Sequence, residues 1–221
     1  MEDYCLIKFN KQIFGEKRKS LASQMGNLFF AFFVAVFIIF MLFSLVYTGI
    51  SITGPSMMPL INTDYRKYPS KEDIAYYREV DSYNYGDLVI ASVVDDDKEI
   101  IKRVIGLPGD YIEIKKSYDG CYYVYRNGYR IDEDYILDIR GMQASNDMFD
   151  RFCGGHITVG AGQLFIMGDN RGDSKDSTYY GCFDYEDIFG RVDYLVDADE
   201  VPFVSIFLQL FFPKFKVNKI G

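Results

Sequence analysis

The stretch GDLVIASVVDDDKEIIKRVIGLPGDYIEIKK, residues 86–116, decides the fold of the chain. It contains three short apolar alternations, LVIASVV, EIIKRVIGL and YIEIKK, which are separated by turn signals. The polar run Asp95–Asp97 follows the first alternation, and Pro108-Gly109-Asp110 follows the second. Short strands joined by such turns are typical of antiparallel β structure. We therefore predict three consecutive strands in this part of the chain.

The sequence that follows predicts further strands and one less regular segment. CYYVYRNG, residues 121–128, has the pattern of a hairpin, and residues 163–167 and 188–196 have the pattern of strands. Tyrosine and phenylalanine, 19 of each, also favour strands. The remainder of residues 115–160 shows no clear alternation. The predicted fold class is therefore mostly β, an antiparallel sheet domain with an irregular insert at about residues 115–160.

A long apolar run precedes this domain. Leu28 to Tyr47 reads LFFAFFVAVFIIFMLFSLVY, and no charged residue occurs from Ser20 to Thr63. A helix needs about 20 apolar residues to cross a bilayer, whereas a cleaved signal peptide has an apolar core of about 7–15. We therefore predict an uncleaved anchor rather than a signal peptide or a buried soluble helix. The predicted parts are residues 1–19, a transmembrane helix at 20–48 and a further domain at 49–221.

Charge predicts the orientation and one class of partner. Residues 1–19 carry five basic and three acidic side chains, and KRK at residues 17–19 adjoins the apolar run. Basic flanks favour the cytoplasmic side, so the N-terminus is expected in the cytoplasm and the domain outside. The chain has a net charge of −8, which argues against nucleic acid as a partner. The apolar C-terminal stretch, residues 201–221, fits a buried strand or a membrane-resting tail equally well.

Several familiar catalytic groups are poorly supported. His156 is the single histidine, lies in the predicted insert, and is more simply explained as structural. The four cysteines lack zinc-ligand spacing, although Cys182 stays open as a nucleophile and Cys121 stays open as a disulfide partner of Cys153. Three aspartates fail the EF-hand spacing: Asp169, Asp173 and Asp176. We expect no metal and no cofactor.

Lys102 is then the remaining candidate for a general base. Alternation in EIIKRVIG puts it on one strand face with Ile100 and Val104. Burial lowers the pKa of a lysine, and a neutral lysine accepts a proton from a serine hydroxyl. The alternative is a lysine at a sheet edge whose ammonium reaches water.

The loop GPSMMPL, residues 54–60, offers the nucleophile. Pro55 and Pro59 fix φ on both sides of Ser56, and Gly54 allows close approach of a substrate backbone. Such a loop presents the Ser56 hydroxyl well, and the Ser56 N–H is a candidate oxyanion donor. The alternative is an ordinary turn at a membrane surface.

Taken together, these motifs resemble the bacterial type I signal peptidases, serine–lysine enzymes that remove signal peptides from exported proteins. GPSMMP is similar to the nucleophile box of that family, and KRVIGLPGD matches its lysine box at every specified position. GDLV, GDNRGDSKDS and Gly190-Arg191-Val192 are similar to further boxes and occur in the family's order. The likeness extends from residue 28 to about residue 192.

The resemblance implies roles for the matching positions. Ser56 would be the nucleophile, Lys102 the general base, and Ser174 would hydrogen-bond Lys102 and orient it. Four further positions would support the site: Arg103, Asp169, Asn170 and Asp176. The loop that binds the oxyanion and the substrate would contain Gly54, Pro55, Met57 and Pro59.

The resemblance also implies the partners and the location. Substrates would be preproteins with signal peptides, bound as extended strands, with small residues at the first and third positions before the cut. The protein would be a single-pass protein of the cell membrane, in contact with the lipid bilayer.

Two positions depart from the family pattern. Leu60 replaces a usual threonine, and Thr178 replaces a usual arginine that would pair with Asp176. Arg171 and Arg191 are candidate substitutes for that arginine. The alternative function is therefore a catalytically degenerate module of the same fold that binds partners at the membrane.

Overall fold

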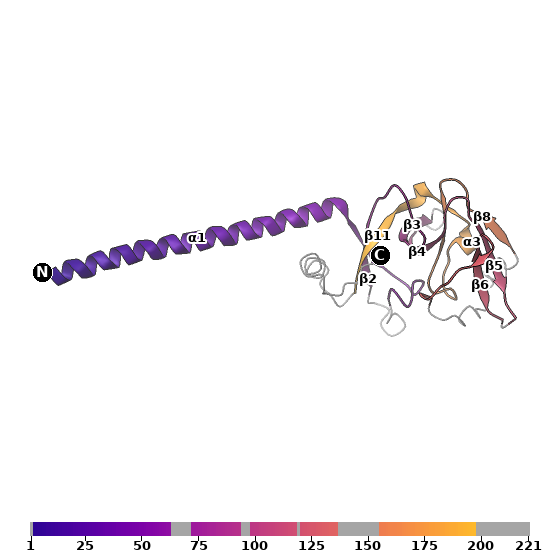
Figure 1. Cartoon of the computed structure of the whole chain (residues 1–221), viewed down its shortest axis with the longest axis horizontal. Helices are drawn as coiled ribbons and strands as arrows, with labels where there is room; N and C mark the ends of the chain where they lie inside the picture. Colours follow the sequence, from indigo (N-terminus) through magenta and orange to yellow (C-terminus); the bar gives the residue numbers. More distant parts are fainter. Residues whose placement is uncertain (1, 63–71, 94–97, 119, 137–154, 198–221) are drawn as a thin grey trace. The chain divides into compact units, whose positions relative to one another are not determined.

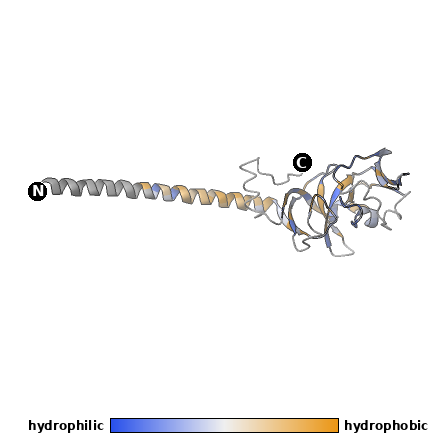
Figure 2. Cartoon of the chain, turned by 90° about the horizontal axis from the view of Figure 1, so that it is seen from below, coloured by the Kyte–Doolittle hydropathy of each residue, from blue (hydrophilic) through white to orange (hydrophobic). Residues whose placement is uncertain are grey.

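The computed structural model describes residues 2–62, 72–93, 98–118, 120–136 and 155–197. The chain divides into two compact units, residues 1–47 and 48–221. The first unit is a single helix, α1 (Glu2–Val46), which is labelled in Figure 1. Its segment Ser23–Val46 is long and apolar enough to cross a membrane, and Figure 2 colours this segment as largely hydrophobic. The predicted N-terminal segment is helical from Glu2 onward.

The second unit contains a seven-stranded sheet in which all neighbours are antiparallel. The strand order is β1-β2-β11-β3-β4-β9-β10. The bounds are β1 (Thr48–Ile52), β2 (Asp73–Arg78), β3 (Leu88–Val93), β4 (Lys98–Gly106), β9 (Gln163–Met167), β10 (Phe183–Asp184) and β11 (Ile188–Val196). The predictions for β3, β4, β9 and β11 are confirmed, whereas β1, β2 and β10 were not predicted.

A second, four-stranded sheet has the order β7-β6-β5-β8. Its strands are β5 (Tyr111–Lys116), β6 (Tyr122–Arg126), β7 (Tyr129–Arg130) and β8 (His156–Thr158). The β6–β7 turn has positive φ at both Asn127 and Gly128, as a two-residue hairpin with a type I′ turn requires. The prediction of a hairpin at residues 121–128 is confirmed. The described part of the predicted insert contains strands β6, β7 and β8 together with the irregular residues 131–136, while residues 137–154 lie outside the described residues.

Two apolar clusters include residues of β4 on either side of Lys102, namely Ile101 and Ile105. We call the loop at residues 54–60, which contains Ser56, the nucleophile loop. The first cluster joins this loop to the large sheet and includes Met57, Ile61, Leu88 and Ile101. The second cluster joins both sheets and includes Ile105, Ile112, Phe165 and Met167. Strands β4 and β9 thus connect the two sheets.

A short helix, α3 (Ser177–Tyr180), and a 3-10 turn, η2 (Tyr185–Asp187), follow β9. The C-terminal residues 198–221 lie outside the described residues.

Candidate active site

The nucleophile loop between β1 and β2 is fixed at both ends. The Asn62 side-chain amide donates to the carbonyls of Ile52 and Gly54, at 2.9 and 3.0 Å. Gly54 has φ +90°, a conformation that favours glycine. Met57 is only 1% exposed and packs in the first cluster. The loop is therefore anchored by its own buried methionine, and Met57 is a core residue rather than part of the substrate surface.

Lys102 lies beside Ser56. The Lys102 Nζ donates to the Ser56 Oγ at 2.8 Å and to the Ile101 carbonyl at 2.8 Å. Lys102 is only 2% exposed. Burial lowers the pKa of Lys102 from 10.5 to about 8, although the carboxylates of Asp176 and Asp169 act in the opposite direction. At pH 7 about one molecule in ten then holds a neutral lysine beside the serine. This geometry suits proton transfer from Ser56 to Lys102.

Ser174 does not contact Lys102 in the predicted way. Its hydroxyl donates to Asp176 Oδ2 at 2.7 Å, and the hydrogen bonds of Lys102 in the described chain go to Ser56 and Ile101. A carboxylate is a stronger acceptor than an amine or a carbonyl, which explains why the Ser174 hydroxyl donates to Asp176. Ser174 therefore positions Asp176, and the Asp176 carboxylate acts on Lys102 by its charge.

Thr178 occupies the position where the family usually has arginine. Its backbone N–H and its hydroxyl donate to Asp176 Oδ1 at 3.1 and 2.8 Å. Asp176 Oδ2 accepts from the Gly168 N–H at 2.9 Å in addition to Ser174. Asp176 thereby caps α3 and is held by four donors without a direct arginine partner among the described residues. Neutral donors thus replace the ion pair.

We predict that Thr178→Val weakens the fold slightly and spares most of the activity. The change removes one hydroxyl donor from Asp176 at nearly constant shape, and a net hydrogen bond contributes about 1 kcal/mol. For a domain of this size, that energy corresponds to a melting temperature lower by about 2–4 °C. Thr158→Val, at an exposed strand position, is the control. Melting temperatures equal to that of the unaltered chain in both variants would contradict the assigned bond.

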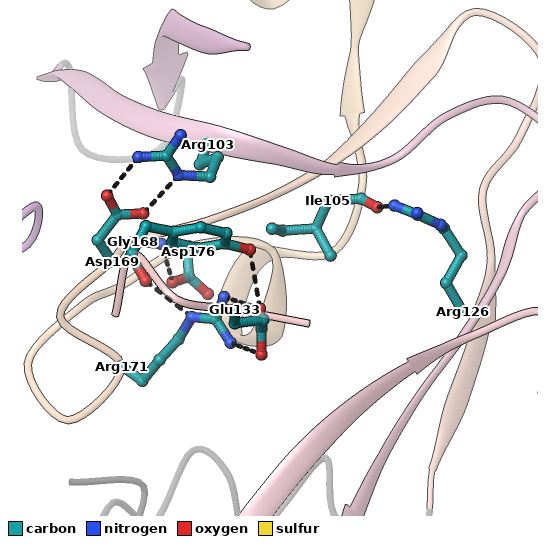
Figure 3. A network of polar contacts seen from close by, with 9 residues as sticks. Arg103, Ile105, Arg126, Glu133, Gly168, Asp169, Arg171 and Asp176 are labelled. Carbon is teal, nitrogen blue, oxygen red and sulfur yellow. Dashed lines mark hydrogen bonds and ion pairs between the residues drawn. The ribbon is translucent and has the colours of Figure 1, made fainter. Parts of the chain in front are cut away.

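Arg103 and Asn170 connect the nucleophile loop, β4 and the turn after β9. Arg103 makes a two-pronged ion pair with Asp169, with Nε–Oδ1 at 2.8 Å and Nη2–Oδ2 at 2.6 Å (Figure 3). The Asn170 backbone N–H donates to the Ser56 carbonyl at 3.0 Å, and its side chain donates to the Pro55 carbonyl at 3.0 Å. The turn is therefore tied directly to the nucleophile loop.

One buried ion pair of this region was not predicted. The Arg171 guanidinium pairs with Glu133, and its Nε donates to the Gly168 carbonyl at 3.0 Å (Figure 3). Glu133 lies in the predicted insert, between two other acidic residues. Nothing in that pattern marks Glu133, because a run of three acidic side chains usually faces solvent. The candidate substitute Arg171 thus has Glu133 as its ion-pair partner.

The other candidate groups lie outside this arrangement. His156 is exposed on β8, with its ring 5.0 Å from that of Tyr111. Burial raises the pKa of the Cys182 thiol, which is the opposite of the shift that activates a cysteine nucleophile. Arg191 pairs with Asp193. Cys153 lies outside the described residues, and the part of the chain that the structure describes holds no cluster of three metal-binding side chains.

Comparisons with known proteins show what the whole chain is similar to. The family model "Signal peptidase, peptidase S26" matches residues 25–196. The chain is 28% identical over 176 residues to signal peptidase I P of Bacillus subtilis subsp. natto, over 79% of this chain and 90% of that protein. It is 32% identical over 149 residues to signal peptidase I S of Bacillus subtilis strain 168, covering 66% and 74%. It is 30% identical over 168 residues to signal peptidase I of Bacillus caldolyticus, covering 73% and 86%.

Proposed function

The chain belongs to the peptidase S26 family of signal peptidases, and from this premise we propose that it cleaves signal peptides from exported preproteins with Ser56 as nucleophile and Lys102 as general base. It is a membrane-anchored serine endopeptidase. The observation that supports the two roles is the 2.8 Å contact between the Ser56 hydroxyl and a lysine that is only 2% exposed.

The proposed reaction uses one lysine for every proton transfer. Neutral Lys102 takes the proton of Ser56 Oγ, which attacks the scissile carbonyl carbon. The resulting ammonium then protonates the leaving amine as the peptide bond breaks. A water molecule that is deprotonated by the same lysine finally hydrolyses the ester on Ser56 and regenerates the serine.

Backbone donors would stabilise the oxyanion in this reaction. The Ser56 N–H makes no hydrogen bond within the described ranges and is therefore available as a donor. Gly54 supplies no hydroxyl, and a Cβ added there would meet open space. The loop therefore leaves room for the substrate beside its backbone.

Two strand edges near the dyad are suited to an extended substrate. Among the described strands, β1 pairs only with β2, and residues 98–102 of β4 pair only with β3. A peptide that adds a strand to such an edge is bound through its backbone, and its side chains set the specificity. We propose that the segment before the cut binds here, with its scissile carbonyl at Ser56.

The anchor would hold the domain on one side of the membrane. Ser23–Val46 of α1 is the membrane-spanning segment, and the KRK cluster at residues 17–19 adjoins it on the N-terminal side. By the positive-inside rule we propose that the N-terminus lies in the cytoplasm and that residues 49–221 lie outside. The domain would then meet signal peptides as they leave the bilayer.

The degenerate-module alternative lacks support in the geometry. It depended on Leu60 and Thr178, and both residues have a structural role: Leu60 packs against the first cluster, and Thr178 holds Asp176. The contact between Ser56 and Lys102 is intact.

Cleavage of a preprotein as a function of pH tests the proposal. We expect the full-length chain in detergent to cut a preprotein at one site, with a rate that rises about tenfold per pH unit below pH 8 and levels off above it. The sign follows from Lys102, because the base acts only when neutral and burial lowers its pKa to about 8. A chelator should leave the rate unchanged. Binding without cleavage would favour the degenerate module, and a rate independent of pH would exclude a lysine base.

A further inference from the structure

We infer that Glu133 and Tyr135, in the segment after the β6–β7 hairpin, are positioning residues for the dyad. Both act on the turn after β9, residues 168–176, which we call the catalytic loop. The inference rests on the proposed function, because the catalytic loop matters only if Ser56 and Lys102 perform the cleavage.

Glu133 is bound to an arginine inside the catalytic loop. Arg171 is 4% exposed and Glu133 is 8% exposed, so the pair is shielded from water. The Arg171 Nη1 donates to Glu133 Oε2 at 3.1 Å, and its Nη2 pairs with Glu133 Oε1 (Figure 3). The Arg171 Nε donates to the Gly168 carbonyl at 3.0 Å. Glu133 thus fixes a side chain that holds the first residue of the catalytic loop.

Tyr135 connects Glu133 to the second arginine of the region. Its hydroxyl donates to Glu133 Oε1 at 3.0 Å, and its ring centroid lies 4.3 Å from the Arg103 Cζ. Arg103 in turn holds Asp169 by two hydrogen bonds. A cation over an aromatic face is stabilised electrostatically. Glu133 and Tyr135 therefore contact both Arg171, which lies in the catalytic loop, and Arg103, which binds this loop.

The segment that carries these residues is itself held by the second cluster. Ile131, Tyr135 and Ile136 pack against this cluster, and the Ile131 N–H donates to the Val124 carbonyl at 3.0 Å. Met167, which precedes the catalytic loop, belongs to the same cluster. The second sheet and the end of β9 therefore share one core, and the contacts of Glu133 start from a fixed support.

A displacement of the catalytic loop would directly displace groups that contact the dyad, because there is no free space around Gly168. A Cβ added at Gly168 would lie 2.5 Å from the Ser56 carbonyl and 2.7 Å from the Ser174 Cβ. The Gly168 N–H also donates to Asp176, whose charge acts on Lys102. Moving Gly168 therefore moves groups on both sides of the dyad.

The charge of Glu133 should also affect how the cleavage rate depends on pH, which a purely structural role would not. Arg171 interacts with Glu133, Tyr135, Asp176 and Asp169, and Lys102 interacts with the same two aspartates. Without the Glu133 charge, the positive charge of Arg171 offsets more of the negative charge of Asp176 and Asp169, so these two carboxylates favour the protonated form of Lys102 less strongly. The acidic limb of the rate profile should therefore move to lower pH.

The test compares Glu133→Gln with Asp134→Asn in the full-length chain, well below both melting temperatures. Asp134 is exposed and one residue away, so its variant loses the same charge outside the pair. We expect Glu133→Gln to lower kcat roughly 100-fold, as small misplacements of catalytic groups do, with KM within about threefold. Its acidic limb should shift to lower pH. Tyr135→Phe keeps the ring over Arg103, so we expect a loss of less than about tenfold.

The outcomes separate this inference from the proposed function. If the unaltered chain cuts, Ser56→Ala does not, and Glu133→Gln melts earlier but keeps its kcat and pH profile, Glu133 is merely structural and the inference is overturned. An equal loss in Asp134→Asn overturns it as well. An inert unaltered chain would overturn the proposed function, and this inference with it. A loss confined to kcat, with the shifted acidic limb, supports positioning.

Discussion

Lys102→Met is expected to abolish preprotein cleavage, with kcat lower by roughly 10⁴- to 10⁶-fold, and Ser56→Ala is expected to do the same. The two groups act as one unit, because the serine hydroxyl is a weak nucleophile until a base removes its proton. No histidine can substitute in the described chain, since His156 lies on β8 and contacts Tyr111. The double variant should therefore be no worse than either single variant.

The design of this experiment separates the base from the fold. Methionine has nearly the volume of lysine and lacks its charge, so Lys102→Met should keep the core filled and melt no earlier than the unaltered chain. Lys115→Met is the control, because Lys115 is exposed on β5, in the other sheet. We expect the Lys115→Met variant to keep full activity. Residual cleavage by Lys102→Met above about 1% of the original rate would contradict the assignment of Lys102 as the base.

The strands around the dyad were predictable because their signals are local. β3, β4 and β5 follow one another through short turns, and each shows an apolar alternation. β1 gave no such signal, because it begins two residues after the end of α1 and its apolar residues continue the membrane run. β2 follows a polar stretch, and its six residues, DIAYYR, do not alternate between apolar and polar. Both strands gain their stability from pairing, with β11 on the other side of β2.

The dyad was also accessible from sequence, in two separate steps. Alternation placed Lys102 among aliphatic residues on one strand face, and the structure shows the burial that lowers its pKa. The partnership with Ser56 joins residues 46 apart in the chain, so it depended on the resemblance of several motifs in order. Periodicity alone does not distinguish Ser56 from an ordinary turn residue. Geometry then supplied the contact itself.

The burial of Glu133 could not be predicted from the sequence. It stands in the run Asp132-Glu133-Asp134, and only the middle side chain is buried. What distinguishes Glu133 is its partner, Arg171, which lies 38 positions away and would lose this ion pair without it. No local pattern encodes that pairing. Likewise, the resemblance implies a hydrogen bond from Ser174 to Lys102, whereas in the structure the Ser174 hydroxyl donates to the nearby Asp176 carboxylate.

Gly168→Ala is expected to lower kcat/KM by at least about 100-fold, the second largest effect among these predictions. The added methyl group would lie 2.5 Å from the Ser56 carbonyl and 2.7 Å from the Ser174 Cβ, and it would overlap the Ser174 Oγ. The Ser56 contact is to backbone, so no side-chain rotation relieves it. The nucleophile loop and the catalytic loop must therefore separate, although the Asn170 N–H bond to the Ser56 carbonyl holds them together.

Gly106→Ala distinguishes this geometric effect from simple loss of stability. Gly106 is also buried without room for a methyl group, but its neighbours are the Ile112 side chain at 3.0 Å and the Phe165 Cβ at 3.1 Å, in the second cluster. Overpacking of this kind costs about 1–3 kcal/mol, so both variants should melt earlier. Only Gly168→Ala should also lose activity per folded molecule, because its methyl group displaces Ser56 and Ser174. Equal kcat values for the two folded variants would mean that the contact at Gly168 serves the fold alone.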